Sequence, residues 1–370
     1  MKQNPLKNLQ ALGQSIWLDY IRRDLLTGHQ LEKFIEEDGL AGITSNPSIF
    51  EKAIAESSDY DQEILKMKLK KQEITSIYEW LTQRDVRDAA DQFRLLYNKM
   101  DANDGYVSLE VNPHLANDSE GTISEARRLW KALDRPNVMI KVPATAEGLP
   151  AITELISEGI NVNVTLLFGL PRYREVAEAY IVGLEARLAN SQPIHHIASV
   201  ASFFLSRIDV LIDPLLDNII AQNNDQSIIA KKIQGETAVA SAKLAYQIYQ
   251  EVFNSPRFKK LMEHGAKAQR LLWASTSTKN PAYSDVKYVE ALIGPQTVNT
   301  LPMETFNAYR DHGEPKPLLE QNLDMAQWIF QRLPELKLDI DKVTKLLLLE
   351  GIDKFKKSYD QLLEALRGKL

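Results

Sequence analysis

The sequence has no cysteine among its 370 residues. This absence excludes disulfide bonds, zinc sites built on thiolates and cysteine nucleophiles. The six histidines are scattered, and the one adjacent pair, His195 and His196, falls where we predict a strand. Because neighbouring side chains on a strand point to opposite faces, these two do not form a metal pair, and we expect no metal site.

Long apolar runs are also missing. No stretch approaches the roughly 18 apolar residues that a membrane span needs, and the first residues lack the apolar run of a signal peptide. A net charge of −6 argues against a general nucleic-acid or anionic-membrane binder, although it leaves room for a local basic pocket. We therefore expect a cytoplasmic protein with no membrane or nucleic-acid partner.

What the chain does contain is a regular alternation of short β-rich segments with longer amphipathic ones. We predict eight strands, at Ser15–Tyr20, Leu40–Ser45, Tyr106–Val111, Asn137–Val142, Ile160–Leu166, His196–Phe203, Arg270–Ser275 and Thr297–Pro302. Strands that alternate with helices pair in parallel through right-handed crossovers. Eight such units fit a closed barrel better than an open sheet, so we predict an α/β fold, the (β/α)8 TIM barrel.

The chain exceeds the roughly 250 residues of a minimal barrel, so it must carry insertions. We expect helical insertions at 47–105 and 208–268, and a helical C-terminal extension that ends in a helix from Asp339 to Leu370. Helix signals elsewhere are Ser124 as a cap for Glu125–Leu133, Pro171 opening a run to Leu188, and Asp285 opening Val286–Ile293. Because repeats and flexible linkers are absent, we expect a single catalytic domain over residues 1–370.

Several predicted strands carry polar residues with a period of two. The fifth places Asn161, Asn163 and Thr165 on one face, and the third does the same with Ser108, Glu110 and Asn112. An exposed antiparallel strand would show the same alternation. However, helical segments flank these strands, and the polar residues gather towards the carboxyl ends, which favours side chains that line a site inside a barrel.

Lys141 stands in the middle of an otherwise apolar strand, Val138–Pro143. A lysine at such a position should be excluded from a core unless it is paired or functional. It could belong to a structural ion pair with an interior carboxylate. Alternatively, burial favours the neutral amine, which can attack a carbonyl group. Asp19 and Glu110, the other interior charges, would then supply two proton carriers beside this nucleophile.

These segments resemble the motifs of a known family. Val138–Leu149 closely resembles the active-site lysine signature of transaldolases, and Gly42–Phe50 resembles their second signature. Three further segments match in the family's order: Val107–Val111, Asn161–Phe168 and Ser202–Asp209. The ending Asn299–Pro302 and the length suggest the longer bacterial-type branch.

The resemblance implies a role for each catalytic residue. It makes Lys141 the Schiff-base lysine and Asp19 the group that takes the proton of the C4 hydroxyl during carbon–carbon cleavage. Glu110 and Thr165 match the pair that holds a catalytic water and carries protons while the carbinolamine is dehydrated. No cofactor and no metal is implied.

The resemblance also implies a set of substrate contacts. Asn46 and Asn163 match side chains that hydrogen-bond the three-carbon unit, and Ser202 matches a residue that contacts substrate hydroxyls. Arg207 and Ser275 match the phosphate site. The family's arginine two residues after the strand-seven serine is replaced here by Ser277. Lys279, two residues further on, either supplies the missing charge or is a solvated loop lysine.

The activity implied is that of a transferase in carbohydrate metabolism. It moves a dihydroxyacetone unit from sedoheptulose 7-phosphate to glyceraldehyde 3-phosphate, giving erythrose 4-phosphate and fructose 6-phosphate in the pentose phosphate pathway. The nearest alternative is a Schiff-base aldolase that releases free dihydroxyacetone from fructose 6-phosphate. A barrel glycosidase that used Asp19 and Glu110 would leave Lys141 unexplained. Sugar phosphates are thus the expected partners, and a homodimer is allowed.

Overall fold

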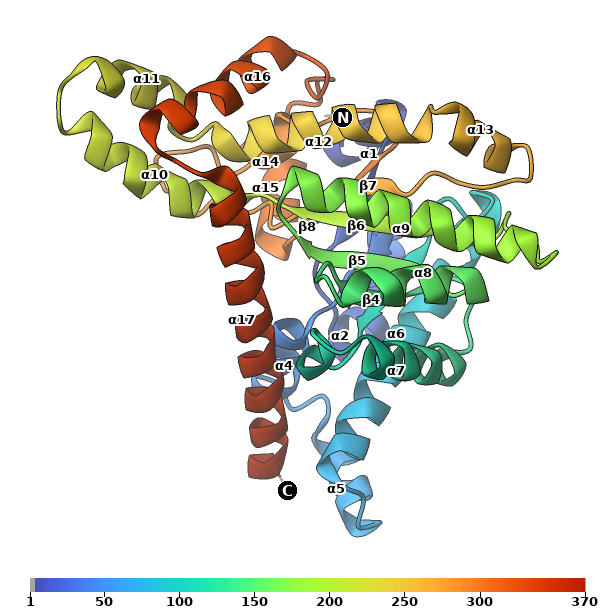
Figure 1. Cartoon of the computed structure of the whole chain (residues 1–370). Helices are drawn as coiled ribbons and strands as arrows, with labels where there is room; N and C mark the ends of the chain where they lie inside the picture. The colour runs from blue at the N-terminus through green and yellow to red at the C-terminus, as the bar shows by residue number, and fades with distance from the viewer. Residues whose placement is uncertain (1–3, 370) are drawn as a thin grey trace.

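The computed structural model describes residues 4–369. Eight parallel strands pair in chain order and close into a barrel, with helices packed around them (Figure 1). The strands are β1 (Gln14–Leu18), β2 (Leu40–Ile43), β3 (Tyr106–Glu110), β4 (Val138–Pro143), β5 (Val162–Leu167), β6 (Ser199–Phe204), β7 (Arg270–Ala274) and β8 (Thr297–Leu301). The predicted (β/α)8 TIM barrel is confirmed.

Two strands begin at least two residues later than we predicted, and a polar side chain explains both differences. β5 begins at Val162 and β6 at Ser199, because Asn161 bonds the backbone there with its side chain. The Asn161 amide donates to Pro136 O and Val138 O, and it accepts from Ala198 N. Asn161 therefore closes the amino ends of the strands and does not line the site. His195 and His196 both lie in a turn before β6, so the prediction that this strand begins at His196 was wrong.

The helices of the barrel outside its insertions connect consecutive strands, except that the first precedes β1 and the last follows β8. These are α1 (Pro5–Ala11), α2 (Arg23–Thr27), α3 (Gln30–Asp38), η1 (Pro113–Leu115), α7 (Ser119–Leu133), α8 (Gly148–Glu158), α9 (Leu170–Ala189), α14 (Lys287–Glu290) and α15 (Met303–His312). Ser124 lies inside α7, where Asp118 is the true cap because its side chain accepts from Gly121 N. α14 is a single turn rather than the eight residues predicted, since Gly294 and Pro295 follow closely.

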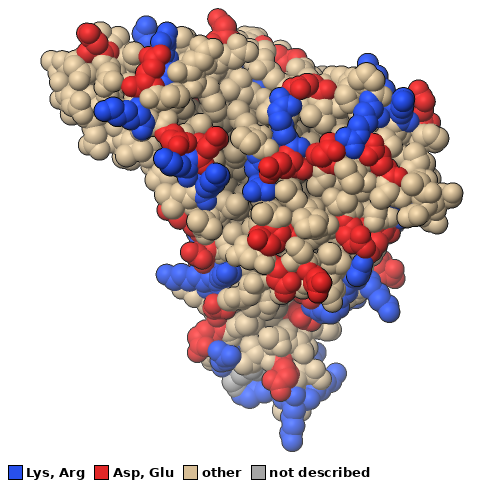
Figure 2. Space-filling view, viewed as in Figure 1, with Lys and Arg blue, Asp and Glu red and all other residues tan. Residues whose placement is uncertain are grey.

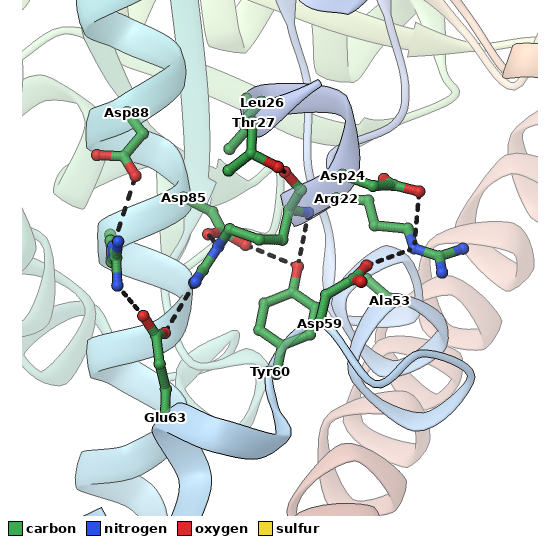
Figure 3. A network of polar contacts seen from close by, with 12 residues as sticks. Arg22, Asp24, Leu26, Thr27, Ala53, Asp59, Tyr60, Glu63, Asp85 and Asp88 are labelled. Atoms are coloured by element: carbon green, nitrogen blue, oxygen red, sulfur yellow. Dashed lines mark hydrogen bonds and ion pairs between the residues drawn. The ribbon is translucent and has the colours of Figure 1, made fainter. Parts of the chain in front are cut away.

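Both predicted helical insertions are present. The first contains α4 (Pro47–Ala55), α5 (Asp61–Leu69) and α6 (Ile74–Lys99), and the second contains α10 (Ser206–Ile220), α11 (Asp225–Ile233), α12 (Thr237–Phe253) and α13 (Pro256–Met262). A buried polar network fastens the first insertion to the barrel (Figure 3). Arg23 Nε lies 2.6 Å from Asp85 Oδ1, Arg23 NH1 lies 2.8 Å from Glu63 Oε2, and the Tyr60 hydroxyl donates to Asp85. The segment that follows β1 is thereby held against α5 and α6.

The C-terminal extension is helical, as predicted. It contains α16 (Leu323–Arg332), η2 (Pro334–Leu336) and α17 (Ile340–Lys369), and Asp339 caps α17 by accepting from Asp341 N and Lys342 N. The predicted end at Leu370 lies outside the described residues. α17 runs along one side of the barrel beside α4 (Figure 1), where the hydroxyl oxygens of Ser48 and Ser358 are 2.6 Å apart. No helix within residues 4–369 is long and apolar enough to cross a membrane.

Candidate active site

A cavity of about 630 Å³ lies at the carboxyl ends of the strands. Eight of the ten predicted site residues line it: Asp19, Asn46, Lys141, Thr165, Ser202, Arg207, Ser275 and Lys279. The other two, Glu110 and Asn163, lie directly behind lining residues. The strand register explains this, because Glu110 pairs with Lys141 and Lys141 pairs with Asn163 across β3, β4 and β5. The site residues therefore come together as the sequence predicted.

Lys141 is buried, with only 4% of its surface exposed. Its neighbours Ile140 and Val142 are fully buried too, so the strand is held from both sides. The Lys141 amine donates to Ser45 O at 3.0 Å and lies 3.4 Å from Glu110 Oε2. It also lies 5.8 Å from the centre of the Phe355 ring, which α17 contributes. The amine thus faces the cavity with one carboxyl partner and an apolar cover.

Glu110 is a buried carboxyl group at the end of β3. Burial raises the pKa of Glu110, and the nearby Lys141 charge only partly opposes that rise. Within the described part of the chain, its Oε2 atom accepts no hydrogen bond. Glu110 can therefore take up and release a proton next to the Lys141 amine.

Asp19 follows β1 and faces the same cavity. Burial raises the pKa of Asp19, while Lys141, a hydrogen bond from Thr44 and the Arg207 charge lower it. Thr44 Oγ1 donates to Asp19 Oδ1 at 2.7 Å and lies 2.7 Å from Thr300 Oγ1, so the carboxyl group is held in one orientation. Sequence reasoning missed Thr44, although it stands in the Gly42–Phe50 signature.

Three polar side chains complete the inner wall. Asn163 is held on both sides, since its Nδ2 donates to Ser108 Oγ at 3.0 Å and its Oδ1 accepts from Ser202 Oγ at 2.6 Å. Thr165 Oγ1 is buried, lines the cavity and has no hydrogen-bond partner among residues 4–369. Asn46 is the N-cap of α4 and accepts from Ile49 N at 3.1 Å. The Thr165 hydroxyl is therefore free to bind a substrate or water.

Besides Lys141 and Arg22, which is paired with Asp24 and Asp59, four cations line the cavity: Arg207, Lys279, and two that sequence reasoning missed, Lys52 of α4 and Lys354 of α17. None of them forms an ion pair with a described residue. Burial lowers the pKa of Lys354, and the nearby charges of Arg207, Lys279 and Lys52 lower it further. Lys279 and Lys354 are exposed while Lys141 and Thr165 are buried, so positive charge gathers at the open end of the cavity. Such a cluster suits an anion.

The serines after β7 stand beside these cations. Ser275 has a positive φ of 55°, a conformation that L-residues rarely adopt, and its Oγ lies 2.9 Å from Ser206 Oγ. Lys279 Nζ donates to Ser277 Oγ at 2.6 Å. Lys279 therefore turns towards the cavity, although sequence alone also allowed a solvated loop lysine.

Comparison with known proteins assigns the chain to a family. The family model described as "Transaldolase/Fructose-6-phosphate aldolase" matches residues 16–366. The chain belongs to this family. It is 50% identical to the transaldolase of Trichodesmium erythraeum, over 100% of this chain and 98% of the relative. It is 46% identical to the transaldolase of Thiobacillus denitrificans and 45% identical to that of Saccharopolyspora erythraea, over at least 97% of each chain. The chain is thus an enzyme of the transaldolase kind, as its motifs suggested.

Proposed function

We propose that this enzyme is the transaldolase of the pentose phosphate pathway and works through a Schiff base on Lys141. It transfers a dihydroxyacetone unit from sedoheptulose 7-phosphate to glyceraldehyde 3-phosphate. We also propose that residues 1–370 form one cytoplasmic catalytic domain. The observation that carries the proposal is the buried Lys141 amine, which adjoins a proton-carrying carboxyl group at the floor of a cavity with a cationic mouth.

The first step is attack by the neutral Lys141 amine on the C2 carbonyl of the donor. The carbinolamine then loses water, and Glu110 suits the proton transfers because its pKa is raised and it lies 3.4 Å from the amine. The Thr165 hydroxyl has no other partner and would hold the water in place. The product is an iminium ion, whose positive nitrogen accepts the electrons released by bond cleavage.

Cleavage needs a base for the C4 hydroxyl of the donor. Asp19 lines the cavity beside Lys141, and the hydrogen bond from Thr44 fixes its orientation. When the C3–C4 bond breaks, the proton of the C4 hydroxyl goes to Asp19, the aldehyde leaves and an enamine stays on Lys141. Asn46, Asn163 and Ser202 would hold the enamine in one pose until an acceptor arrives.

The phosphate group would occupy the open end of the cavity. Arg207 offers a guanidinium fork and Ser275 a hydroxyl, while Lys279 replaces the charge that is lost at Ser277. This arrangement sets the direction of the donor, with its carbonyl carbon at Lys141 and its phosphate outward. Sugar phosphates are therefore preferred over free sugars.

Trapping with borohydride in an Asp19→Ala variant tests the mechanism. With fructose 6-phosphate the variant should form the iminium but not cleave it. Asp19 takes the proton of the C4 hydroxyl only after the iminium has formed. Reduction should then leave a six-carbon adduct on Lys141, which peptide mass mapping can place. An adduct on another lysine, or none in the wild-type enzyme, would contradict the proposal. Release of free dihydroxyacetone in the presence of an acceptor would instead indicate the aldolase.

A further inference from the structure

A second cavity, of about 250 Å³, adjoins the candidate active site from behind. It shares no lining residue with the main cavity, and it lies between β3, α6, α7 and α17. Glu110 is the point where the two spaces meet. Its side chain lines the second cavity, while its Oε2 atom lies 3.4 Å from Lys141, which lines the main one.

The second cavity leads from this buried carboxyl group to solvent. Among its lining residues Glu110 and Tyr359 are buried, Tyr78 and Glu125 are partly exposed, and Arg128 is exposed. All the lining residues of the second cavity carry polar side chains, except Leu109, Leu115 and Leu129. Polar side chains of the lining can therefore hydrogen-bond water molecules in the cavity.

Tyr78 lines the second cavity and interacts electrostatically with carboxyl groups of both kinds, buried and partly exposed. Burial is the main cause that raises the pKa of Tyr78. Electrostatic interactions with Tyr359, Glu110, Glu79 and Glu125 raise it further. The Tyr78 hydroxyl thus lies within electrostatic reach of both the buried and the partly exposed carboxyl groups. The rings of Tyr78 and Tyr359 meet edge to face at 5.3 Å. Among residues 4–369, neither hydroxyl has a hydrogen-bond partner, so both can bond water.

Schiff-base chemistry would make use of such a route. Condensing a ketone with a neutral amine takes up one proton and releases one water, with the carbonyl oxygen leaving in that water. While the donor is bound, its carbon chain and phosphate stand between Lys141 and the open end of the main cavity. A second route would let the proton, and the water held by Thr165, exchange with solvent while the donor is bound.

We propose that the second cavity is a path for water and protons between solvent and Glu110, with Tyr78 and Tyr359 as its relay groups. The proposal rests on the Schiff-base function proposed above. The two tyrosines act through Glu110 and the water it handles, so they are positioning residues and do not touch the substrate. The carbonyl oxygen leaves as water, passes the tyrosines and is replaced from bulk solvent when the iminium is hydrolysed.

Oxygen exchange tests this path. Fructose 6-phosphate carrying oxygen-18 at C2 is incubated with the enzyme and an acceptor, and the label lost from recovered donor is compared with product formed. In a Tyr78→Phe, Tyr359→Phe double variant, water trapped beside the iminium returns to the same carbon. The ratio of label loss to transfer should therefore fall several-fold, while the KM for the donor stays unchanged. Tyr97→Phe is the matched control, because Tyr97 lies on α6 but lines neither cavity.

The outcomes separate the two proposals. An unchanged ratio in the folded double variant would show that water leaves through the main cavity, and the path would be overturned alone. Absence of both exchange and a borohydride adduct in the wild-type enzyme would overturn the Schiff-base mechanism, and the path with it. Phenylalanine keeps both rings, and a melting curve reports whether each variant is folded.

Discussion

Lys141 and Glu110 form a buried pair, yet the pair is not held as a structural salt bridge would be. A structural pair keeps its carboxylate ionised, with several hydrogen bonds to the charged form. Here burial outweighs the lysine charge and raises the pKa of Glu110, and Oε2 accepts no hydrogen bond among residues 4–369. The geometry therefore favours a pair that exchanges a proton.

Lys141→Met should abolish borohydride trapping and transfer, because the reactive amine is lost while methionine keeps the apolar stem. The variant also removes the charge that lowers the pKa of Glu110, so that pKa rises further in the folded state. A carboxyl group whose folded pKa is raised destabilises the fold above that pKa, and the penalty disappears as the pH falls through it. The melting point should therefore drop more at about pH 8 than at about pH 5.

A Lys141→Met, Glu110→Gln double variant is the control for this prediction. This double variant has no ionisable group at either position of the pair. Its melting point should therefore change by the same amount at both pH values. Trapping that persists in Lys141→Met would contradict the nucleophile assignment.

The sequence predicts the position of a site residue when the residue's own strand determines it. The period-two pattern put Glu110 and Thr165 on the inner faces of their strands, because a strand alternates its faces wherever it lies. Lys141 was found differently, as a charge in an otherwise apolar strand. The period-two pattern misplaced Asn161, since alternation gives the face but not the end of the barrel. Lys52 and Lys354 could not be found, because their helices reach the cavity only through tertiary packing.

At the scale of elements, α17 is the helix that completes the site. It supplies Phe355 over the Lys141 amine and Lys354 at the cavity mouth, and it packs along α4. Strand positions were predicted to within about three residues because β-branched runs mark them. The start of α7 was predicted wrongly. Asp118 and Ser124 are both good N-cap residues, and only the fold selects between them.

Lys354→Gln should raise the KM for fructose 6-phosphate with little change for unphosphorylated fructose. A charge-assisted contact is worth about 1.5–3 kcal/mol, and because Lys354 is exposed we expect the lower figure, about tenfold in affinity. Steady-state kinetics with both sugars measures the difference. Lys357→Gln is the matched control, an exposed lysine of α17 that does not line the cavity, and it should change neither constant. An equal loss for both sugars would point to a folding defect.

At the scale of the whole molecule, one face of the surface has charges of both signs side by side. Figure 2 shows acidic and basic side chains interspersed over one face, in line with the net charge of −6. The charges that matter for the fold are inside instead. The Arg23–Asp85 pair joins the segment after β1, which carries Asp19, to the long helix α6 of the first insertion (Figure 3).

Asp85→Asn should lower the free energy of unfolding by about 3–5 kcal/mol, because it leaves the buried Arg23 charge without its main partner. Asp88→Asn on the same helix removes only a 3.6 Å contact between the exposed side chains of Arg84 and Asp88, and it should cost less than about 1 kcal/mol. Denaturant unfolding measures both. Equal effects would show that the buried network does not fasten the insertion to the barrel.

Because α17 is the last helix of the described chain, it is synthesised after all eight strands. All eight strands have been made once the ribosome has passed Leu301, and domains fold from the amino end during synthesis. The barrel can therefore close while Lys354 and Phe355 are still untranslated. A chain that stops early would carry Lys141 and its carboxyl partners in place, but without the cover over the amine or the outer cation. We therefore expect a chain that stops before α17 to bind a phosphorylated donor more weakly, because it lacks Lys354 and Phe355.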